Sequence, residues 1–261
     1  MIVWTVANQK GGVGKTTTAV TLAGLLAARG RRVLLVDCDP HSSLTYYLGV
    51  EADTLTTTSY DLFLAGNSVT AELVQEATVV TRFENISLLP ASVALATLDR
   101  KFSHRDGAGL VLRRALARVS SRYDHVLIDC PPVLGVLMVN ALAASSRILV
   151  PVQTEFLALK GLERMMHTLD IMQNSRAEPF RCTVIPTMFD RRTKASQLAL
   201  QELTNLYRDK VWSGVIPIDT RLRDASTQHT PANLLHPHAR GVVAYAALLD
   251  HLLEQAQESQ A

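Results

Sequence analysis

The sequence is poor in cysteine and in aromatic residues, and neither sign of charge dominates it. Only three cysteines occur in 261 residues, at positions 38, 130 and 182. Cys38, Cys130 and Cys182 are far apart and lack any CxxC or Cys/His ligand spacing, which gives no support to a disulfide framework or a zinc knuckle and favours a reducing cytoplasm. Lysine and arginine number 26 against 24 acidic residues, so the total charge does not indicate a nucleic-acid binder.

Long apolar runs are also missing. No charged segment followed by an apolar stretch opens the chain, and no uncharged run approaches the roughly 18 residues that span a bilayer, which argues against secretion and membrane insertion. With 48% hydrophobic and 19% charged residues, the chain is instead typical of a globular protein with a full core. We expect a single domain over residues 1–261, with a polar tail from about residue 255.

Short apolar runs rich in β-branched residues alternate with segments of helical period. The predicted strands are Ile2–Ala7, Val33–Val36, Ile86–Leu89, Val126–Ile128, Ile148–Val152 and Thr183–Ile185. The predicted helices are residues 16–29, 108–122, 136–145, 159–173, 195–208 and a closing helix over 239–257. Residues 51–84 are less regular and suggest an excursion beside the sheet. The alternation predicts an α/β fold with a doubly wound, mostly parallel sheet flanked by helices.

A glycine-rich segment follows the first predicted strand and leads into a predicted helix. It reads Gln9-Lys10-Gly11-Gly12-Val13-Gly14-Lys15-Thr16-Thr17. A strand, a glycine turn and a helix N-terminus together aim backbone N–H groups and a positive helix dipole at one point, which suits a phosphate chain. Lys15 adds a full charge, and the Thr16 hydroxyl can bind Mg²⁺. The pattern predicts a nucleotide-phosphate loop, although Gln9 stands where the standard pattern has glycine.

Acidic residues end two of the predicted strands. Asp37 and Asp39 follow the second strand in Asp37-Cys38-Asp39-Pro40, and Asp129 follows the strand at 126–128. Ligands of such sheets bind at the carboxyl edge, where a carboxylate beside a phosphate loop suits Mg²⁺, usually through a water. Taken alone, either acid could be a turn residue or a helix cap. Together with the loop, they predict a magnesium-nucleotide site with Asp129 as the main carboxylate.

The form KGGVGKTT resembles the deviant Walker A box of the ParA and MinD family of ATPases. The resemblance extends over nearly the whole chain, through VANQKGGVGKTTT, VLLVDCDPHSSLTYYLG, YDHVLIDCPP, ILVPVQTEFLALKGLERM, VIPTMFDRRTKAS and GVIPIDTRLRDAS. The opening and the DPHSSLTYYLG segment further resemble the ParC branch, whose members place chemotaxis arrays at cell poles. The family resemblance implies a slow, partner-stimulated ATPase that uses ATP/ADP and Mg²⁺ and forms a face-to-face dimer when ATP is bound.

Specific roles follow from the resemblance for residues that match the family motifs. It implies that Lys10 reaches the phosphates of the opposite subunit, that Asp39 positions the attacking water, and that Asp37 supports the metal and phosphate shell. Lys10, Lys15 and Asp39 are therefore the expected catalytic residues, and Thr16, Asp37 and Asp129 the expected magnesium residues. The expected nucleotide contacts are Lys10, Gly11, Gly12, Val13, Gly14, Lys15, Thr16, Thr17, Met188 and Pro217.

The resemblance also implies how the dimer forms and senses nucleotide. Gly12 and Val13 are expected where the two subunits approach closely, and Pro131–Gly135 is expected to act as a switch that senses the γ-phosphate.

Partner surfaces are expected late in the chain. The family uses this region for sequence-independent DNA binding, so the resemblance implies that DNA phosphates contact Arg191, Arg192, Lys194, Arg221 and Arg223. The alternative is that these residues form an ordinary solvated basic surface. A ParB-like protein or a polar scaffold is the expected activator, and the expected location is cytoplasmic, at the nucleoid or at a cell pole. The acidic to neutral end of the chain disfavours membrane anchoring. A metal-cluster carrier or reductase and a small-molecule ligase of the same fold are the alternative functions.

Overall fold

A computed structural model describes residues 1–102, 107–174 and 179–258. The strands are β1 (Ile2–Val6), β2 (Val33–Asp37), β3 (Val79–Val80), β4 (Ile86–Leu89), β5 (His125–Asp129), β6 (Arg147–Gln153) and β7 (Cys182–Thr187). They form one sheet in the order β3-β4-β2-β5-β1-β6-β7. All described pairings are parallel except that of the edge strand β3 with β4. The predicted doubly wound, mostly parallel sheet is confirmed.

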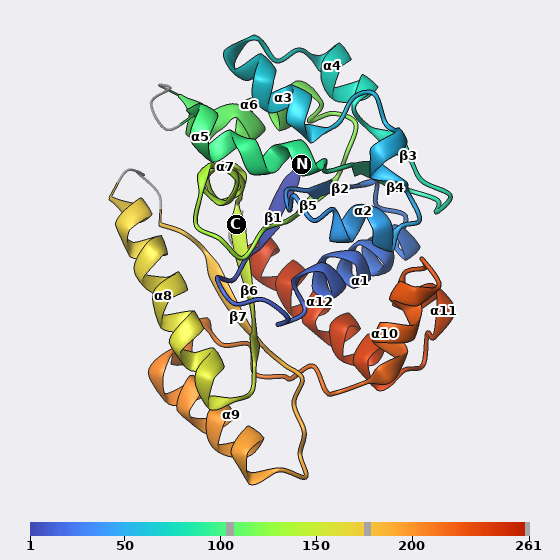
Figure 1. Ribbon diagram of the computed structural model, residues 1–261. Helices are drawn as coiled ribbons and strands as arrows, with labels where there is room; N and C mark the ends of the chain where they lie inside the picture. The colour runs from blue at the N-terminus through green and yellow to red at the C-terminus, as the bar shows by residue number, and fades with distance from the viewer. Residues whose placement is uncertain (103–106, 175–178, 259–261) are drawn as a thin grey trace.

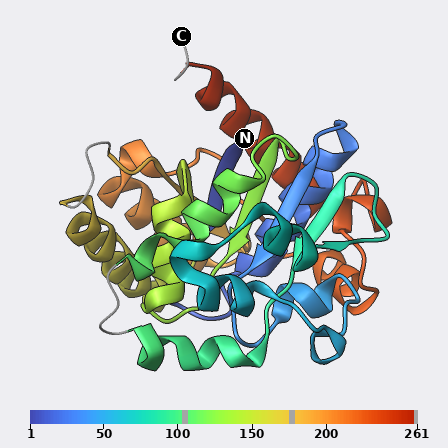
Figure 2. The ribbon, with the colours of Figure 1, turned by 90° about the horizontal axis from the view of Figure 1, so that it is seen from above.

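Helices cover both faces of the sheet (Figures 1 and 2). They are α1 (Lys15–Ala28), α2 (Ser43–Tyr47), α3 (Ser59–Ala65), α4 (Ala71–Glu76), α5 (Leu98–Phe102), α6 (Val111–Arg118), α7 (Val136–Ala144), α8 (Phe156–Gln173), α9 (Lys194–Leu206), α10 (Thr220–Thr227), α11 (Ala232–Leu235) and α12 (Arg240–Glu258). Among the described residues, five short 3-10 helices lie at Ala52–Thr54, Gly66–Ser68, Val93–Thr97, Ala108–Leu110 and Arg208–Lys210. No described helix is long and apolar enough to cross a membrane.

Except in the edge strand β3, the residues of the strands divide between two main cores. Val3 of β1 belongs to the core that contains residues of α6, α7 and α8, whereas its neighbour Trp4 belongs to the core that contains residues of α1 and α12. Leu34 and Leu35 of β2 divide between the same two cores. This alternation explains why the strands are apolar throughout, because parallel strands buried on both faces need apolar side chains on each.

The helix and strand predictions agree with the structure to within a few residues. Two differences concern the helix predicted at 108–122, whose α-helical part is α6, and the helix predicted from 159, which begins at Phe156. The expected polar tail begins inside α12, whose last turns extend beyond the rest of the fold in Figure 2. Residues 259–261 of that tail lie outside the described residues.

Candidate functional site

The loop between β1 and α1 presents open backbone at the carboxyl edge of the sheet. Gly12 and Gly14 have φ of 74° and 92°, in the left-handed region that favours glycine. A Cβ built on Gly11, Gly12 or Gly14 would meet no described atom within 4 Å. Gly14 is the N-cap of α1, and no described side chain caps this helix. The first N–H groups of α1 and its positive dipole therefore remain for an anion such as a phosphate.

Polar side chains fix the start of this loop to β6 and α8. Asn8 Nδ2 donates to the Pro151 carbonyl at 2.8 Å, and Asn8 Oδ1 accepts the Lys10 N–H at 3.0 Å. Gln9 Nε2 donates to Thr168 Oγ1 of α8 at 2.7 Å. The residue that departs from the standard glycine pattern thus anchors the loop to the neighbouring helix.

The two lysines of the loop take different positions. Lys15 Nζ lies 3.3 Å from the Lys10 carbonyl oxygen, to which it donates, so it folds back along the loop. Lys10 instead forms an ion pair with Glu155, which lies two residues after the end of β6 and is the N-cap of α8. Both partners are partly exposed, at 28% and 42% of their side chains. Lys10 is therefore held within its own chain, at the surface beside the loop.

Asp129 is brought to the loop by the register of the sheet. It is paired with Val6 of β1 and with Asp37 of β2, all at the carboxyl ends of their strands. Thr16 Oγ1 donates to Asp129 Oδ2 at 2.6 Å, while Oδ1 is buried and has no partner among the described residues. Burial, followed by the nearby Asp37 charge, raises the pKa of Asp129 to about 8. A half-buried hydroxyl beside a buried carboxylate with an open oxygen fits Mg²⁺ that also takes phosphate and water ligands.

Asp37 is occupied by the turn that follows it. Its Oδ2 accepts the backbone N–H and the hydroxyl of Thr45 at 2.9 and 2.7 Å, and its Oδ1 accepts the Asp39 N–H at 3.0 Å. Burial raises the pKa of Asp37 to about 6 despite these bonds. The geometry gives Asp37 an organising role in the turn, and its predicted contribution to the metal shell stays a prediction.

A cavity of about 320 Å³ opens beside the loop. It brings together the predicted nucleotide contacts Val13, Gly14, Thr17, Met188 and Pro217. Its lining also includes Tyr245 of α12, whose hydroxyl lies 2.8 Å from Thr18 Oγ1. The cavity has the place and the mixed lining expected for the base and sugar of a nucleotide. Val13 is fully buried, so of the residues predicted at the subunit contact only Gly12 is exposed.

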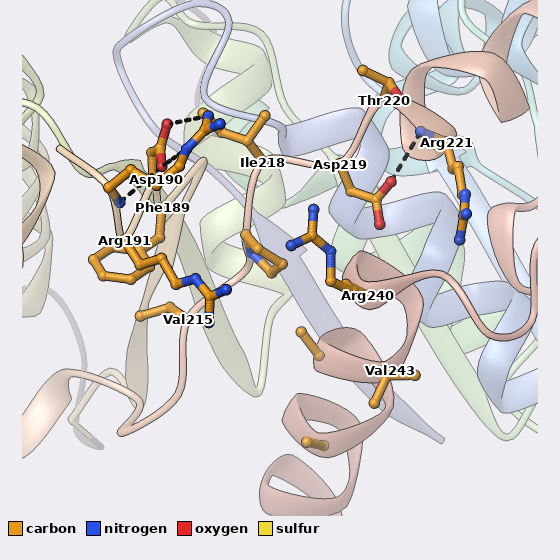
Figure 3. Close-up of a pocket in the computed structure, with 14 residues that line it drawn as sticks. Phe189, Asp190, Arg191, Val215, Ile218, Asp219, Thr220, Arg221, Arg240 and Val243 are labelled. Atoms are coloured by element: carbon orange, nitrogen blue, oxygen red, sulfur yellow. Dashed lines mark hydrogen bonds and ion pairs between the residues drawn. The ribbon is translucent and has the colours of Figure 1, made fainter.

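The basic residues predicted for DNA divide between two places. Arg191, Arg192 and Arg221 line a groove of about 1060 Å³, joined by Arg240 from the start of α12 (Figure 3). Arg223 lines the cavity beside the loop instead, and Lys194 lies exposed at the start of α9.

Acidic residues alter this groove in two ways. Asp190 binds the Arg192 guanidinium at 2.8 and 2.9 Å, which lowers the pKa of Asp190 to about 2 and offsets the arginine charge. Asp219 accepts the N–H groups of Arg221 at 3.1 Å and of Gly241 at 2.9 Å, which ties the starts of α10 and α12 together. The groove is thus basic mainly through Arg191, Arg221 and Arg240.

Two of the three cysteines are buried among apolar groups, and Cys182 is partly buried. Cys38 and Cys130 are fully buried, and burial raises the pKa of both thiols. Within the described ranges, no group of three or more His, Cys, Asp or Glu side chains is placed to hold a metal ion.

Large apolar side chains are exposed on the turns that flank the loop. Val133 and Leu134, in the predicted switch after β5, are 64% and 48% exposed. Phe156 and Leu157, at the start of α8, are 67% and 69% exposed. Because β5 and β6 lie on either side of β1, these turns flank the phosphate loop at one edge of the sheet.

Comparisons with known proteins place this geometry in a family. A family model described as an AAA domain matches residues 1–181. The sporulation initiation inhibitor protein Soj of Bacillus subtilis is 38% identical over 244 residues, covering 93% of this chain and 94% of that protein. The chain belongs to the ParA/Soj family of ATPases. The chromosome partitioning protein ParA of Caulobacter vibrioides is 36% identical over 259 residues, covering 98% of this chain and 95% of that protein.

Solved structures agree with the family assignment. A structure from Mycobacterium smegmatis, named cobyrinic acid a,c-diamide synthase, holds ADP and magnesium. It is 34% identical with a TM-score of 0.85, and the match covers 99% of this chain and 96% of that one. The predicted family and ATPase class are confirmed, whereas the ParC branch has no specific support among these relatives.

Several residues of the site carry no motif that sequence reasoning could use. Glu155 and Asn8 act through partners 145 and 143 residues away, and Thr45 acts through Asp37, eight residues before it. Arg240 stands alone between Ala239 and Gly241, far from the two basic stretches. Asn8, directly after the strand predicted at Ile2–Ala7, and Glu155, three residues after the strand predicted at Ile148–Val152, had a signal in their positions, because strand ends gather at the site edge.

Proposed function

We propose that this ATPase is a nucleotide-controlled switch that positions or segregates a cellular cargo. The observation that carries the proposal is the meeting of an open phosphate loop, Thr16 with a buried Asp129, and an adjoining nucleotide-sized cavity at one sheet edge. ATP/ADP and Mg²⁺ are the proposed ligands, supported by the nucleotide and magnesium in the related Mycobacterium smegmatis structure. Magnesium would neutralise charge on the phosphates, held there by Thr16 and, through water, by Asp129.

In the proposed cycle, two ATP-bound subunits close over their phosphate loops. The exposed apolar turns around Val133 and Phe156 would then become buried, which favours closure. Lys10 would exchange its ion pair with Glu155 for the phosphates of the opposite subunit, where a cation stabilises charge developing during hydrolysis. Asp39 would position the attacking water, and a partner would accelerate the slow step.

The proposed carrier is non-specific DNA bound at the groove that Arg191, Arg221 and Arg240 line. This groove shares residues 217–219 with the nucleotide cavity, which supports a nucleotide-dependent surface. We place the protein in the cytoplasm, at the nucleoid or at a cell pole, with a ParB-like protein or a polar scaffold as activator. The cargo is a chromosome, a plasmid or, as the ParC resemblance suggests, a polar chemotaxis array.

Retention on random-sequence DNA tests the switch and the carrier together. Binding is measured without nucleotide, with ADP and with a slowly hydrolysed ATP analogue, across a salt titration. Retention only with the triphosphate, falling steeply with salt, is the expected result. Nucleotide binding without any DNA retention would overturn the DNA carrier and favour a protein scaffold at the pole.

The main alternative is a small-molecule ligase, which the name of the Mycobacterium smegmatis relative supports. A ligase consumes ATP only when its acceptor substrate is present, whereas the proposed switch hydrolyses ATP slowly alone. Basal hydrolysis by the purified protein, stimulated by DNA together with a partner, separates the two. Basal turnover that is absent until a small carboxylic acid and an amine donor are added would favour the ligase.

Lys15 and Asp39 are expected to act at different steps. Lys15→Ala should lose most nucleotide affinity, because it removes the charge that faces the bound phosphates. Asp39→Ala should bind ATP normally and stop turnover, because it removes only the group that positions the water. Equal ATPase rates in Asp39→Ala and the wild type would refute the second assignment.

Gly12→Val is expected to block the ATP dimer, because Gly12 is exposed at the proposed subunit contact. Its φ of 74° adds backbone strain of about 1–2 kcal/mol for a valine, so nucleotide affinity must be measured in parallel. Gly11→Ala, at a neighbouring exposed position without a positive φ, is the matched control. Scattering data showing an ATP-loaded dimer of Gly12→Val would contradict this expectation.

A further inference from the structure

His41 contacts the carboxylate of Asp39 through both its backbone and its ring. The His41 N–H donates to Asp39 Oδ1 at 3.0 Å, and His41 Nδ1 lies 2.7 Å from the same oxygen. Among the described residues, Asp39 Oδ2 accepts no hydrogen bond. The Asp39 side chain is 14% exposed, whereas the His41 ring is 81% exposed. One oxygen of Asp39 is thus held and the other is open.

The backbone beneath this pair is fixed by the turn itself. The Asp39 N–H donates to Asp37 Oδ1, and the Asp39 carbonyl accepts the Ser42 N–H at 2.8 Å. Pro40 restricts its own φ, and Ser42 has a φ of 54° in the left-handed region. The main freedom left to Asp39 is therefore rotation of its carboxylate, and the His41 ring is the side chain that opposes this rotation.

We propose that His41 is a positioning residue for Asp39. Its ring holds Oδ1 so that Oδ2 keeps one direction, toward the water that attacks the γ-phosphate. A carboxylate that is already oriented needs no reorganisation when the water is activated, which lowers the barrier. This inference rests on the proposed role of Asp39 in hydrolysis and adds a residue that acts through it.

Turnover and nucleotide affinity of point variants test the inference. His41→Ala should lower kcat about tenfold, the scale expected for a misplaced group, and leave KM for ATP unchanged. His41→Asn should recover most of the loss, because its Nδ2 occupies the place of the ring Nδ1 and can donate to the same oxygen. His167→Ala, at an exposed position on α8, is the matched control and should keep the wild-type kcat. Circular dichroism verifies that each variant is folded.

A double variant shows whether His41 acts only through Asp39. Adding His41→Ala to Asp39→Ala should leave the residual rate of ATP hydrolysis, measured in single-turnover reactions, the same as in Asp39→Ala alone, because the group that His41 positions is already gone. Wild-type kcat in His41→Ala, a raised KM alone, or losses that multiply in the double variant would each overturn the inference. If Asp39→Ala itself turned over at the wild-type rate, the proposed role of Asp39 would fail first, and this inference with it.

Discussion

Comparison of Asp129→Asn with the wild type measures how much the carboxylate at position 129 lowers the free energy of unfolding. The Asp129 side chain is 1% exposed and has a single hydrogen-bond partner, Thr16, among the described residues. Burial and the Asp37 charge raise its pKa from 3.8 to about 8. Asp129 keeps its proton in the folded chain at pH values where the unfolded chain releases it. The contribution of protonated Asp129 to the free energy of unfolding is therefore complete below pH 3.8 and is lost as the pH rises through 8. Between pH 6 and 8 the loss is about 2 kcal/mol.

Thermal unfolding without nucleotide and with a chelator measures this loss. For a chain of this length, about 2 kcal/mol corresponds to about 4–8 °C in Tm. The Tm of Asp129→Asn should therefore gain that amount relative to the wild type between pH 6 and pH 8. Mg²⁺ with an ATP analogue should raise the Tm of the wild type far more than that of the variant, because the cation compensates a carboxylate that the variant lacks.

The matched control is Asp170→Asn, at an exposed position on α8, whose pH dependence should follow the wild type. Parallel Tm curves for Asp129→Asn and the wild type would refute the reasoning.

Two further predictions concern stability away from the site. His125 is buried, neither ring nitrogen has a described partner, and burial lowers its pKa to about 4. The neutral ring contributes fully to the free energy of unfolding above about pH 6.5, and this contribution is lost as the pH falls toward 4. His125→Phe keeps a ring against Trp4, so its free energy of unfolding should fall by about 2 kcal/mol less than that of the wild type between pH 7 and pH 5. Equal losses in thermal scans would contradict this. Gly24→Ala would place a Cβ 2.1 Å from Asn233 Oδ1 and should lower the free energy of unfolding by about 1–3 kcal/mol in denaturant titrations, with partial recovery in the double variant with Asn233→Ala.

Most strands and long helices could be predicted because their signal is local. β2 and β5 are continuous buried runs, and α1 and α12 carry apolar residues at helical spacing. The short elements could not be predicted in the same way. β3 has two residues and exists through its pairing with β4, and α11 packs on α1 only because Gly24 lets the two helices approach closely. Such elements form only with packing or pairing partners that cannot be identified from the local sequence.

The same distinction between local signals and long-range contacts applies to the candidate site. Lys15, Thr16 and Asp129 could be predicted because a phosphate loop and a strand-end acid are patterns within a few residues. The ion pair of Lys10 with Glu155 could not, since it joins two loops 145 residues apart. The offset of the Arg192 charge by Asp190 also depends on side-chain geometry that a count of basic residues misses.

The hydrogen bonds of the two buried aspartates at neighbouring strand ends indicate which of them is available to bind a ligand. Asp37 and Asp129 are paired in register and equally buried, yet protein donors give three hydrogen bonds to Asp37 and one to Asp129. The difference agrees with their pKa values of about 6 and about 8, since hydrogen bonds to a carboxylate favour its charged form. A carboxylate that only stabilised the turn would be satisfied by the turn, as Asp37 is. Asp129 keeps a buried oxygen without a described partner beside a hydroxyl and a phosphate loop, which is the arrangement that a bound cation completes.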